Sequence, residues 1–258
     1  MGNLLGSTDA SEPPPPPPPP PPRGDYPYLW AIRSPNILDW KNGISSEDVI
    51  RKMAAAQAQL PVRIGTREET GIFLGDATCA RDVGRLRSLQ IGAIVNVAGP
   101  ASRNCDMDGE YTRHGIDVVR LPAEDEDGFP MLRLHLDTVR KHIRQWRAAA
   151  GEGGCNVLIH CTAGINRSGV LVAALLMEFE QHLTVLEAVR HIRSRRGNAF
   201  LWNESFQEQL VAHARGLGQL GEPLEGTPDV FPPGMFLAAG ERHEKTQKRN
   251  VRALFDKI

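Results

Sequence analysis

An almost entirely apolar run at residues 170–179 constrains the fold of this chain more than any other feature. The run is rich in Ala and Leu and is too long for one strand, so it predicts a helix that is mostly buried. A shorter run at residues 157–159 is rich in β-branched side chains and predicts a buried strand. Because few residues separate the two runs, a tight loop must join strand to helix, and the rest of the chain is organised around this unit.

The loop between the two runs, residues 161–167, carries a pattern suited to binding an anion, and we call it the phosphate loop. The first turn of a helix offers unpaired N–H groups and a positive dipole end. Arg167 then follows where its planar guanidinium can bind two oxygens of one phosphate group. The same donors stabilise the thiolate of Cys161, which is the nucleophilic form. The loop therefore predicts a phosphate site with a nucleophile beneath the phosphorus.

This loop resembles the His-Cys-x5-Arg-Ser/Thr signature of the cysteine-dependent protein tyrosine phosphatases, and the chain around it resembles the dual-specificity phosphatase branch. Every defining position is present in His160-Cys161-Thr162-Ala163-Gly164-Ile165-Asn166-Arg167-Ser168. The resemblance implies that Cys161 is the nucleophile and that Ser168 donates a hydrogen bond to the departing thiolate. It implies an orienting role for His160. The implied phosphate-binding residues are Thr162, Ala163, Gly164, Ile165, Asn166 and Arg167.

Cleavage of a phosphate ester by a thiolate also needs a proton donor for the leaving oxygen. A positioned acid of this kind contributes about 10²–10⁴-fold in rate. By the family's Ala-x-Asp pattern, Asp125 in the acidic segment 124–127 is the implied general acid, and Asp127 is the alternative. Without the phosphate loop, four consecutive acids would indicate only a solvated loop. Crowding of like charges provides a reason for one of them to stay protonated near neutral pH.

These residues predict a reaction in two steps that requires no metal and no organic cofactor. Cys161 attacks phosphorus while Asp125 protonates the departing hydroxyl, and Asp125 then activates the water that hydrolyses the cysteinyl phosphate.

The remaining patterns predict an α/β fold with a central, mostly parallel sheet flanked by helices, as in dual-specificity phosphatases. Residues 203–210 resemble the family's C-terminal Asn-x-x-Phe-x-x-Gln-Leu helix, which implies that Asn203 supports the phosphate loop by hydrogen bonding.

Tyr111 is a further strand candidate, and residues 103–109 are predicted to be a polar connecting loop. The other predicted strands cover residues 72–75, 91–99 and 114–121, and the other predicted helices cover residues 49–60, 77–90, 131–150 and 184–195.

Composition along the chain predicts four regions. Residues 1–25 are expected to be a disordered leader, and residues 26–60 an N-terminal extension that packs on the domain or docks beside it. Residues 61–216 form the predicted dual-specificity phosphatase catalytic domain. Residues 217–258, rich in Gly, Pro and charged side chains, are expected to be a tail.

The leader carries two features with open interpretations. Gly2 could accept an N-myristoyl chain and give weak, reversible membrane association, but Gly6 occupies the usual Ser/Thr position, so a non-acylated start is the alternative. The unbroken proline run from Pro13 to Pro22 must adopt polyproline II, because every φ is restricted and no amide donor remains. It could dock on a polyproline-binding adaptor or act as a stiff spacer.

Net charge and cysteine spacing restrict which partners and which cellular compartment we expect. A formal net charge of -1 gives no support for a nucleic-acid partner. The irregular spacing of the cysteines indicates neither a metal site nor a secreted disulfide framework. We therefore expect a cytoplasmic protein, with a nuclear location or a membrane surface reached through Gly2 as alternatives. The cysteines are Cys79, Cys105, Cys155 and Cys161.

The predicted substrate is a phosphoprotein, dephosphorylated at phosphotyrosine and phosphoserine/threonine. The resemblance covers residues 72–211, too short for the pocket-building insertions of the larger tyrosine-specific enzymes. A phosphoinositide phosphatase is one alternative, although the phosphate loop lacks the lysines of that branch. An RNA 5′-phosphatase is another, because residues 164–167 follow a Gly-x-Asn-Arg pattern, although no basic stripe accompanies it. A non-catalytic phosphoprotein-binding scaffold that uses the proline run is the third.

Overall fold

The computed structural model describes residues 24–41, 60–65, 71–99, 107–151, 154–197 and 200–223, with the backbone alone for residues 34–41. Several predictions fall elsewhere in the chain. Those for Gly2, for the proline run from Pro13 to Pro22, for the helix at residues 49–60 and for most of the tail lie outside the described residues.

Five strands form one mixed sheet in the order β1-β2-β5-β3-β4. The strand β1 is antiparallel to its neighbour β2, and the other pairs are parallel. The prediction of a mostly parallel central sheet is therefore confirmed. The strands are β1 (Val62–Arg63), β2 (Ile72–Gly75), β3 (Ile91–Asn96), β4 (Asp117–Arg120) and β5 (Asn156–His160).

The register of the parallel strands brings their carboxyl ends to one edge of the sheet. Gly75 of β2 and Asn96 of β3 both pair with His160 of β5, and Asn96 also pairs with Arg120 of β4. The loops that follow these strands therefore leave the sheet side by side. This edge of an open parallel sheet is where ligands bind in α/β folds, and it is where the phosphate loop begins.

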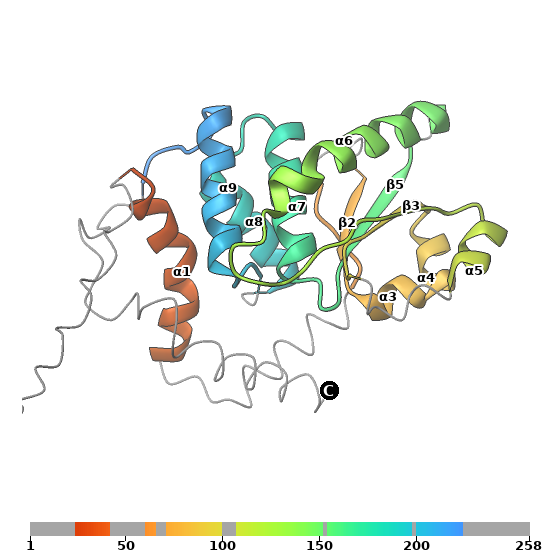
Figure 1. Ribbon diagram of the computed structural model, residues 1–258, viewed down its shortest axis with the longest axis horizontal. Coiled ribbons are helices and arrows are strands. Elements are labelled where there is room, and N and C mark those ends of the chain that lie inside the picture. The colour runs from red at the N-terminus through yellow and green to blue at the C-terminus, as the bar shows by residue number, and fades with distance from the viewer. Residues whose placement is uncertain are drawn as a thin grey trace, which may run out of the picture.

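Helices cover both faces of the sheet (Figure 1). Alternate residues of the central strand β5 belong to two hydrophobic cores. Val157 and Ile159 lie in the larger core, whereas Leu158 lies in the smaller one. The smaller core lies under α3 (Ala77–Arg81), α4 (Val83–Ser88) and α5 (Asp108–Arg113), and the larger one under α6 (Met131–Ala150), α7 (Arg167–Phe179), α8 (Val185–Arg196) and α9 (Glu204–Leu217). No helix in the described ranges is both long and apolar enough to cross a bilayer.

The helix α7 occupies the centre of the larger core, as its apolar sequence predicts. All of its residues from Ser168 to Met177 are buried, and it packs against α6, α8, α9 and β2. Close packing requires glycine at one position, because a Cβ on Gly169 would lie 2.7 Å from the ring of Phe200. The helix that follows the phosphate loop therefore cannot shift without disturbing its neighbours.

Three local predictions are wrong. The predicted helix at 77–90 is two helices, α3 and α4, because the carboxylate of Asp82 accepts the N–H of Arg85 and starts a new helix. Tyr111 lies in α5 and not in a strand, and its hydroxyl donates to the carbonyl of Ala80 at 2.6 Å. Asp108 and Gly109, predicted to be loop, belong to the same helix. The remainder of that predicted loop, apart from Met107, lies outside the described residues.

The helix α1 (Tyr26–Lys41) lies against α8 and α9, at the side of the domain away from α3, α4 and α5 (Figure 1). Leu29 and Ile32 are almost fully buried and belong to the larger core. The hydroxyl of Tyr28 also donates to the carbonyl of Gly221 at 2.7 Å. The start of the predicted N-terminal extension is thus packed against α8 and α9.

Candidate active site

The phosphate loop surrounds the sulfur of Cys161, which is only 1% exposed. The amide of Gly164 and the hydroxyl of Ser168 each donate to Sγ at 3.2 Å. Ser168 lies in the first turn of α7, so the sulfur also faces the positive end of a buried helix. Donors that converge on sulfur stabilise its anionic form, which is the form that attacks phosphorus.

The backbone of the phosphate loop depends on the glycine at its centre. Gly164 has φ of +65°, in the left-handed region that other residues rarely adopt. A Cβ at this position would lie 2.5 Å from the carbonyl oxygen of Gly75, so the loop passes directly over the end of β2. The carbonyl of Thr162 accepts the N–H of Ala77 at 3.2 Å and holds the loop to the start of α3.

Arg196, at the end of α8, binds the outer side of the phosphate loop. Its Nη2 donates to the carbonyl of Ala163 at 2.8 Å, and its Nε donates to the carbonyl of Gly164 at 3.0 Å. In a trans peptide the carbonyl and the next N–H point in opposite directions. Binding of the Ala163 carbonyl therefore directs the Gly164 N–H towards Sγ. Burial lowers the pKa of Arg196, and the carboxylate of Asp76 opposes that shift.

Sequence reasoning did not identify Arg196 as a site residue. It lies far along the chain from Cys161 and contacts backbone carbonyls, for which the sequence carries no pairing signal. Its only local hint is its place in a basic last turn of α8, where cations commonly interact with the helix end.

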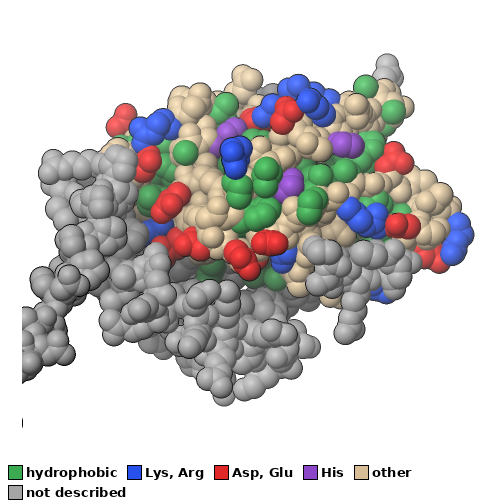
Figure 2. Space-filling model, in the orientation of Figure 1, with side chains coloured by type: hydrophobic (Ala, Val, Ile, Leu, Met, Phe, Trp, Pro, Cys, Tyr) green, Lys and Arg blue, Asp and Glu red, His purple; other side chains and the backbone are tan. Residues whose placement is uncertain are grey.

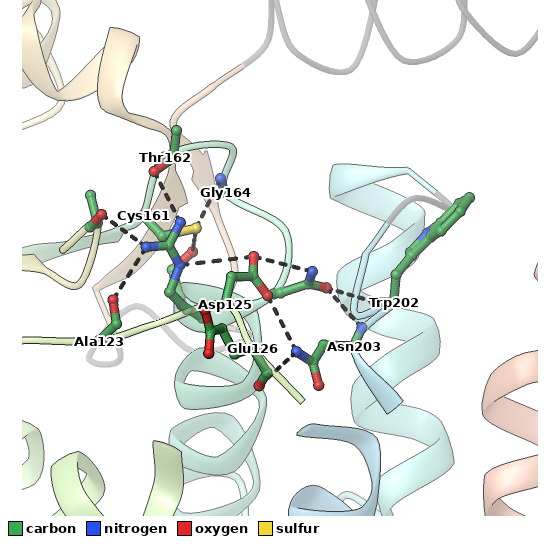
Figure 3. Close-up of polar contacts among 12 residues, drawn as sticks. Ala123, Asp125, Glu126, Cys161, Thr162, Gly164, Trp202 and Asn203 are labelled. Atoms are coloured by element: carbon green, nitrogen blue, oxygen red, sulfur yellow. Dashed lines mark hydrogen bonds and ion pairs between the residues drawn. The ribbon is translucent and has the colours of Figure 1, made fainter. Parts of the chain in front are cut away.

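The guanidinium of Arg167 is fixed by oxygen atoms from three parts of the chain. Its Nη1 donates to the carbonyls of Ala98 at 2.8 Å and Ala123 at 3.4 Å, and its Nη2 donates to the hydroxyl of Thr162 at 3.0 Å. Ala98 follows β3 and Ala123 follows β4, so the aligned strand ends position this side chain. Figure 3 shows Thr162 and Ala123 converging on it beside Cys161.

The segment after β4, residues 121–128, brings Asp125 to the phosphate loop, and we call it the acid loop. Asp125 Oδ2 lies 3.3 Å from Nδ2 of Asn166 and 3.8 Å from Nε of Arg167. Its side chain is 35% exposed. In the space-filling view, acidic side chains gather in a band that extends from α9 across the acid loop (Figure 2).

Asp127, the alternative acid, has a different environment. It lies in the turn at residues 127–128, where the amide of Gly128 donates to the hydroxyl of Ser205 in α9. Burial raises the pKa of Glu208 in α9, and the carboxylate of Asp127 adds to that increase. The carboxylate of Asp127 therefore affects the pKa of Glu208 in α9, whereas Asp125 contacts the phosphate loop.

Asn203 contacts the site in a different way from the one predicted. Its side-chain Nδ2 donates to Oδ1 of Asp125 at 3.4 Å and to the carbonyl of Glu126 at 3.3 Å, so it holds the acid loop. Its Oδ1 accepts the N–H of Phe206 at 3.2 Å and caps α9. The contact with the phosphate loop comes from its backbone N–H, which donates to Oδ1 of Asn166 at 3.2 Å.

The side chain of Asn166 joins the two loops. Its Oδ1 accepts the backbone N–H groups of Trp202 at 2.7 Å and Asn203 at 3.2 Å, and its Nδ2 donates to Asp125 (Figure 3). Two donors facing the amide oxygen and a carboxylate facing the nitrogen determine which way the amide points. The sequence predicted a phosphate-binding residue, and the structure adds a bridge to the acid loop that the sequence did not suggest.

His160 lies beneath the phosphate loop, fully buried at the end of β5. Burial lowers its pKa to about 4, and the positive charges of Arg120 and Arg167 act in the same direction. The imidazole is therefore neutral at pH 7. Its Nδ1 lies 3.3 Å from the carbonyl of Cys161, a geometry that suits a proton on Nδ1 and helps to orient the start of the loop.

The described residues contain no cluster of three or more His, Cys, Asp or Glu side chains suited to a metal ion. Cys79, Cys155 and Cys161 are free thiols there. Cys79 lies in α3, where burial and the carboxylate of Asp76 raise the pKa of its thiol. Its environment is thus unlike the cluster of donors around Cys161.

Comparisons with known proteins agree with this geometry. The model of the dual specificity phosphatase catalytic domain matches residues 72–216. The chain therefore belongs to the dual-specificity phosphatase family, as its phosphate loop indicates.

Two relatives and one solved structure show the extent of the similarity. The human dual specificity protein phosphatase 26 is 35% identical over 149 residues, which cover 58% of this chain and 66% of that protein. The mouse dual specificity protein phosphatase 13B is 35% identical over 140 residues, which cover 54% of this chain and 67% of that protein. The crystal structure of human DUSP28 aligns with a TM-score of 0.44 at 25% identity, over 61% of this chain and 94% of that one. The chain thus spans 66% of the length of the phosphatase 26 relative.

Proposed function

We propose that this protein hydrolyses phosphotyrosine and phosphoserine/threonine in phosphoprotein substrates through a cysteinyl-phosphate intermediate. The observation that carries the proposal is the buried sulfur of Cys161, which accepts hydrogen bonds from Gly164 and Ser168 next to a fixed Arg167. Membership of the dual-specificity phosphatase family supports the same chemistry.

In the first step, the thiolate of Cys161 attacks phosphorus and the ester P–O bond breaks. Asp125, in its protonated form, transfers its proton to the leaving oxygen. Arg167 and the amides of the phosphate loop bind the non-bridging oxygens, whose charge they stabilise in the transition state. The distance of 3.8 Å between Oδ2 of Asp125 and Nε of Arg167 supports the assignment of Asp125 as the acid beside the predicted phosphate position.

In the second step, Asp125 accepts a proton from water as the water oxygen attacks phosphorus. The P–S bond breaks, inorganic phosphate leaves, and the thiolate of Cys161 forms again. The hydroxyl of Ser168 and the amide of Gly164 donate to that thiolate and make it a better leaving group.

Hydrolysis of aryl phosphates by the purified full chain tests the mechanism. Turnover by the unmodified protein and its loss in Cys161→Ser are expected, because serine has no comparable anionic form at neutral pH. Ser168→Ala should produce a burst of phenol followed by slow turnover, because only the second step weakens. Undiminished hydrolysis by Cys161→Ser would exclude the cysteinyl-phosphate route.

The substrate class requires parallel assays. We expect hydrolysis of phosphotyrosyl and phosphothreonyl peptides at rates above those on phosphoinositides and on 5′-triphosphorylated RNA. A reversed order would favour one of the two alternative phosphatase classes, and binding of phosphopeptides without any turnover would favour the scaffold.

The predictions for the leader and for the compartment stay predictions. Incorporation of a myristoyl label that is lost in Gly2→Ala would support reversible membrane association, and no incorporation would favour the non-acylated start. Capture of an adaptor that depends on the run from Pro13 to Pro22 would support a docking role, whereas equal capture after its replacement by a Gly/Ser spacer would contradict it. Imaging of the tagged full chain would show whether it is cytoplasmic, nuclear or at a membrane.

A further inference from the structure

The helix α1 lies outside residues 72–216, the part that matches the family, yet side chains of α8 and α9 connect it to the segment that holds both catalytic loops. That segment is residues 200–203, between α8 and α9. Its amides bind the phosphate loop, and Asn203 binds the acid loop. Contacts of α1 with α8 and α9 therefore reach the site through this segment.

Two buried side chains connect α1 to residue 201. Arg33 of α1 donates from Nε to Oε1 of Gln207 at 2.8 Å, and Gln207 donates from Nε2 to the carbonyl of Leu201 at 2.8 Å. Arg33 is 7% exposed and Gln207 is 2% exposed. Buried polar groups are costly to leave without partners, so this chain of hydrogen bonds holds its three members in one arrangement.

Leu201 needs such support because its φ is +61°. A residue with a side chain in this region has a strained backbone, which persists only where its surroundings hold it. Gln207 binds its carbonyl, and its N–H donates to the carbonyl of Ile165 in the phosphate loop at 3.3 Å. The strained residue is thus held between α9 and the phosphate loop.

A second connection runs from α1 to the same segment. Arg193 of α8 donates from Nη2 to the carbonyl of Ile32 at 2.8 Å and to the carbonyl of Phe200 at 3.4 Å. Arg33 also forms ion pairs with Glu204 at 3.6 Å and Glu208 at 3.5 Å, in the first turns of α9. The start of α9, whose cap is Asn203, is therefore held from the α1 side as well.

We propose that α1 is a positioning element of the active site and that Arg33 is a positioning residue. Arg33 acts through Gln207 on residues 200–203, and through them on the carbonyl of Ile165 and on Asp125. This inference rests on the proposed phosphatase function. Arg33 lies outside residues 72–216, the part that matches the family, whereas Gln207 and Leu201 lie inside it.

The test compares aryl phosphates whose leaving groups differ in their need for a proton. In the full chain, Arg33→Met and Gln207→Met should lower kcat/KM on phenyl phosphate roughly tenfold, less than the about 10²-fold that a 1 Å misplacement costs. The loss on 4-nitrophenyl phosphate should be smaller, because 4-nitrophenolate leaves without a proton and depends less on Asp125.

Tyr28→Phe is the matched control. It removes the hydrogen bond from the first turn of α1 to Gly221 and leaves residues 200–203 untouched. It should lower thermal stability but leave both rates unchanged. Equal losses on both substrates in Arg33→Met, equal losses in Tyr28→Phe, or unchanged rates in Arg33→Met and Gln207→Met would each overturn the proposal.

A binding measurement separates this proposal from the proposed function. If the unmodified chain hydrolyses no aryl phosphate, the phosphatase function fails, but the arrangement of the phosphate loop can still be measured by calorimetric titration with tungstate, a phosphate mimic. Arg33→Met should then bind tungstate more weakly than Tyr28→Phe does. Equal affinities, or no binding by the unmodified chain, would overturn the role of Arg33.

Discussion

The phosphate loop is buried at Cys161, Gly164 and Ile165 and is held mainly through its backbone, whereas the acid loop is mostly exposed and is held by a few side chains. Arg196, Ala77 and Leu201 all bind backbone groups of the phosphate loop. The carboxylate of Asp125 is held by Asn166, Asn203 and Arg167 at distances of 3.3–3.8 Å. From this difference we expect the proposed nucleophile, Cys161, to be fixed before substrate arrives and the proposed acid, Asp125, to adjust to different leaving groups.

The largest expected effect comes from changing the backbone of the phosphate loop. Gly164→Ala should lower kcat/KM by about 10²–10³-fold on every aryl phosphate, because the Cβ would force the loop away from Gly75 and misplace the donor to Sγ. Gly115→Ala is the control, since its φ of +66° is similar but nothing lies within 4 Å of the added Cβ. It should lose about 1 kcal/mol of stability and no activity. Similar activity in the two variants would contradict the rigid phosphate loop.

A change in the acid loop should depend on the leaving group. Asp125→Asn is expected to lower kcat on phenyl phosphate by about 10²-fold and to affect 4-nitrophenyl phosphate far less. Asp127→Asn should change either rate less than about twofold, as expected of a surface site away from the chemistry. Steady-state rates across the series check this, and the opposite pattern would reassign the acid to Asp127.

A smaller effect, on stability, concerns the buried imidazole under the phosphate loop. The pKa of His160 is about 4 in the folded protein and about 6.5 when unfolded, so the unfolded chain binds more protons between these values. Its contribution to stability is therefore complete above pH 6.5 and declines as the pH falls towards 4, by about 3 kcal/mol at most.

Denaturant unfolding at several pH values measures this loss. His160→Asn, which cannot titrate in this range, should flatten the dependence between pH 6.5 and pH 4. An equally steep decline in that variant would assign the effect to other groups.

The smallest expected effect separates the two contributions of Asn203. Asn203→Ala should lose about 1 kcal/mol of stability, because α9 loses its cap, and roughly fivefold in kcat through Asp125. Asn203→Ser keeps a good capping oxygen but cannot reach Asp125, so it should retain stability and show the same loss in kcat. Full activity in Asn203→Ser would mean that the acid loop does not depend on this contact.

Local sequence patterns predicted those parts of the fold in which burial follows chain periodicity. The amphipathic spacing of Leu132, Leu136, Val139 and Ile143 predicted the helix over 131–150 with the bounds that α6 has. The break at Asp82 was missed, because an Asp inside a helical pattern also suits an ordinary helix surface. Tyr111 was misassigned for a similar reason: one aromatic residue fits a strand as well as the buried face of a helix.

In the candidate site too, local patterns identified residues that lie close together in the sequence. Cys161, Arg167 and Ser168 belong to one contiguous segment, so the sequence could identify them together. Arg196 binds carbonyls of the phosphate loop, and Arg33 binds the side-chain amide of Gln207, each far away along the chain. Contacts of that kind depend on how helices pack, and the basic last turn of α8, for Arg196, is the one local sign of them.

The burial of Leu29 and Ile32 has a practical consequence for work on the isolated domain. A fragment cut at residues 72 and 216 would lack α1, and the apolar surface that these side chains cover on α8 and α9 would face water. Exposed apolar surface of this kind promotes self-association. We therefore expect such a fragment to aggregate more readily than the full chain.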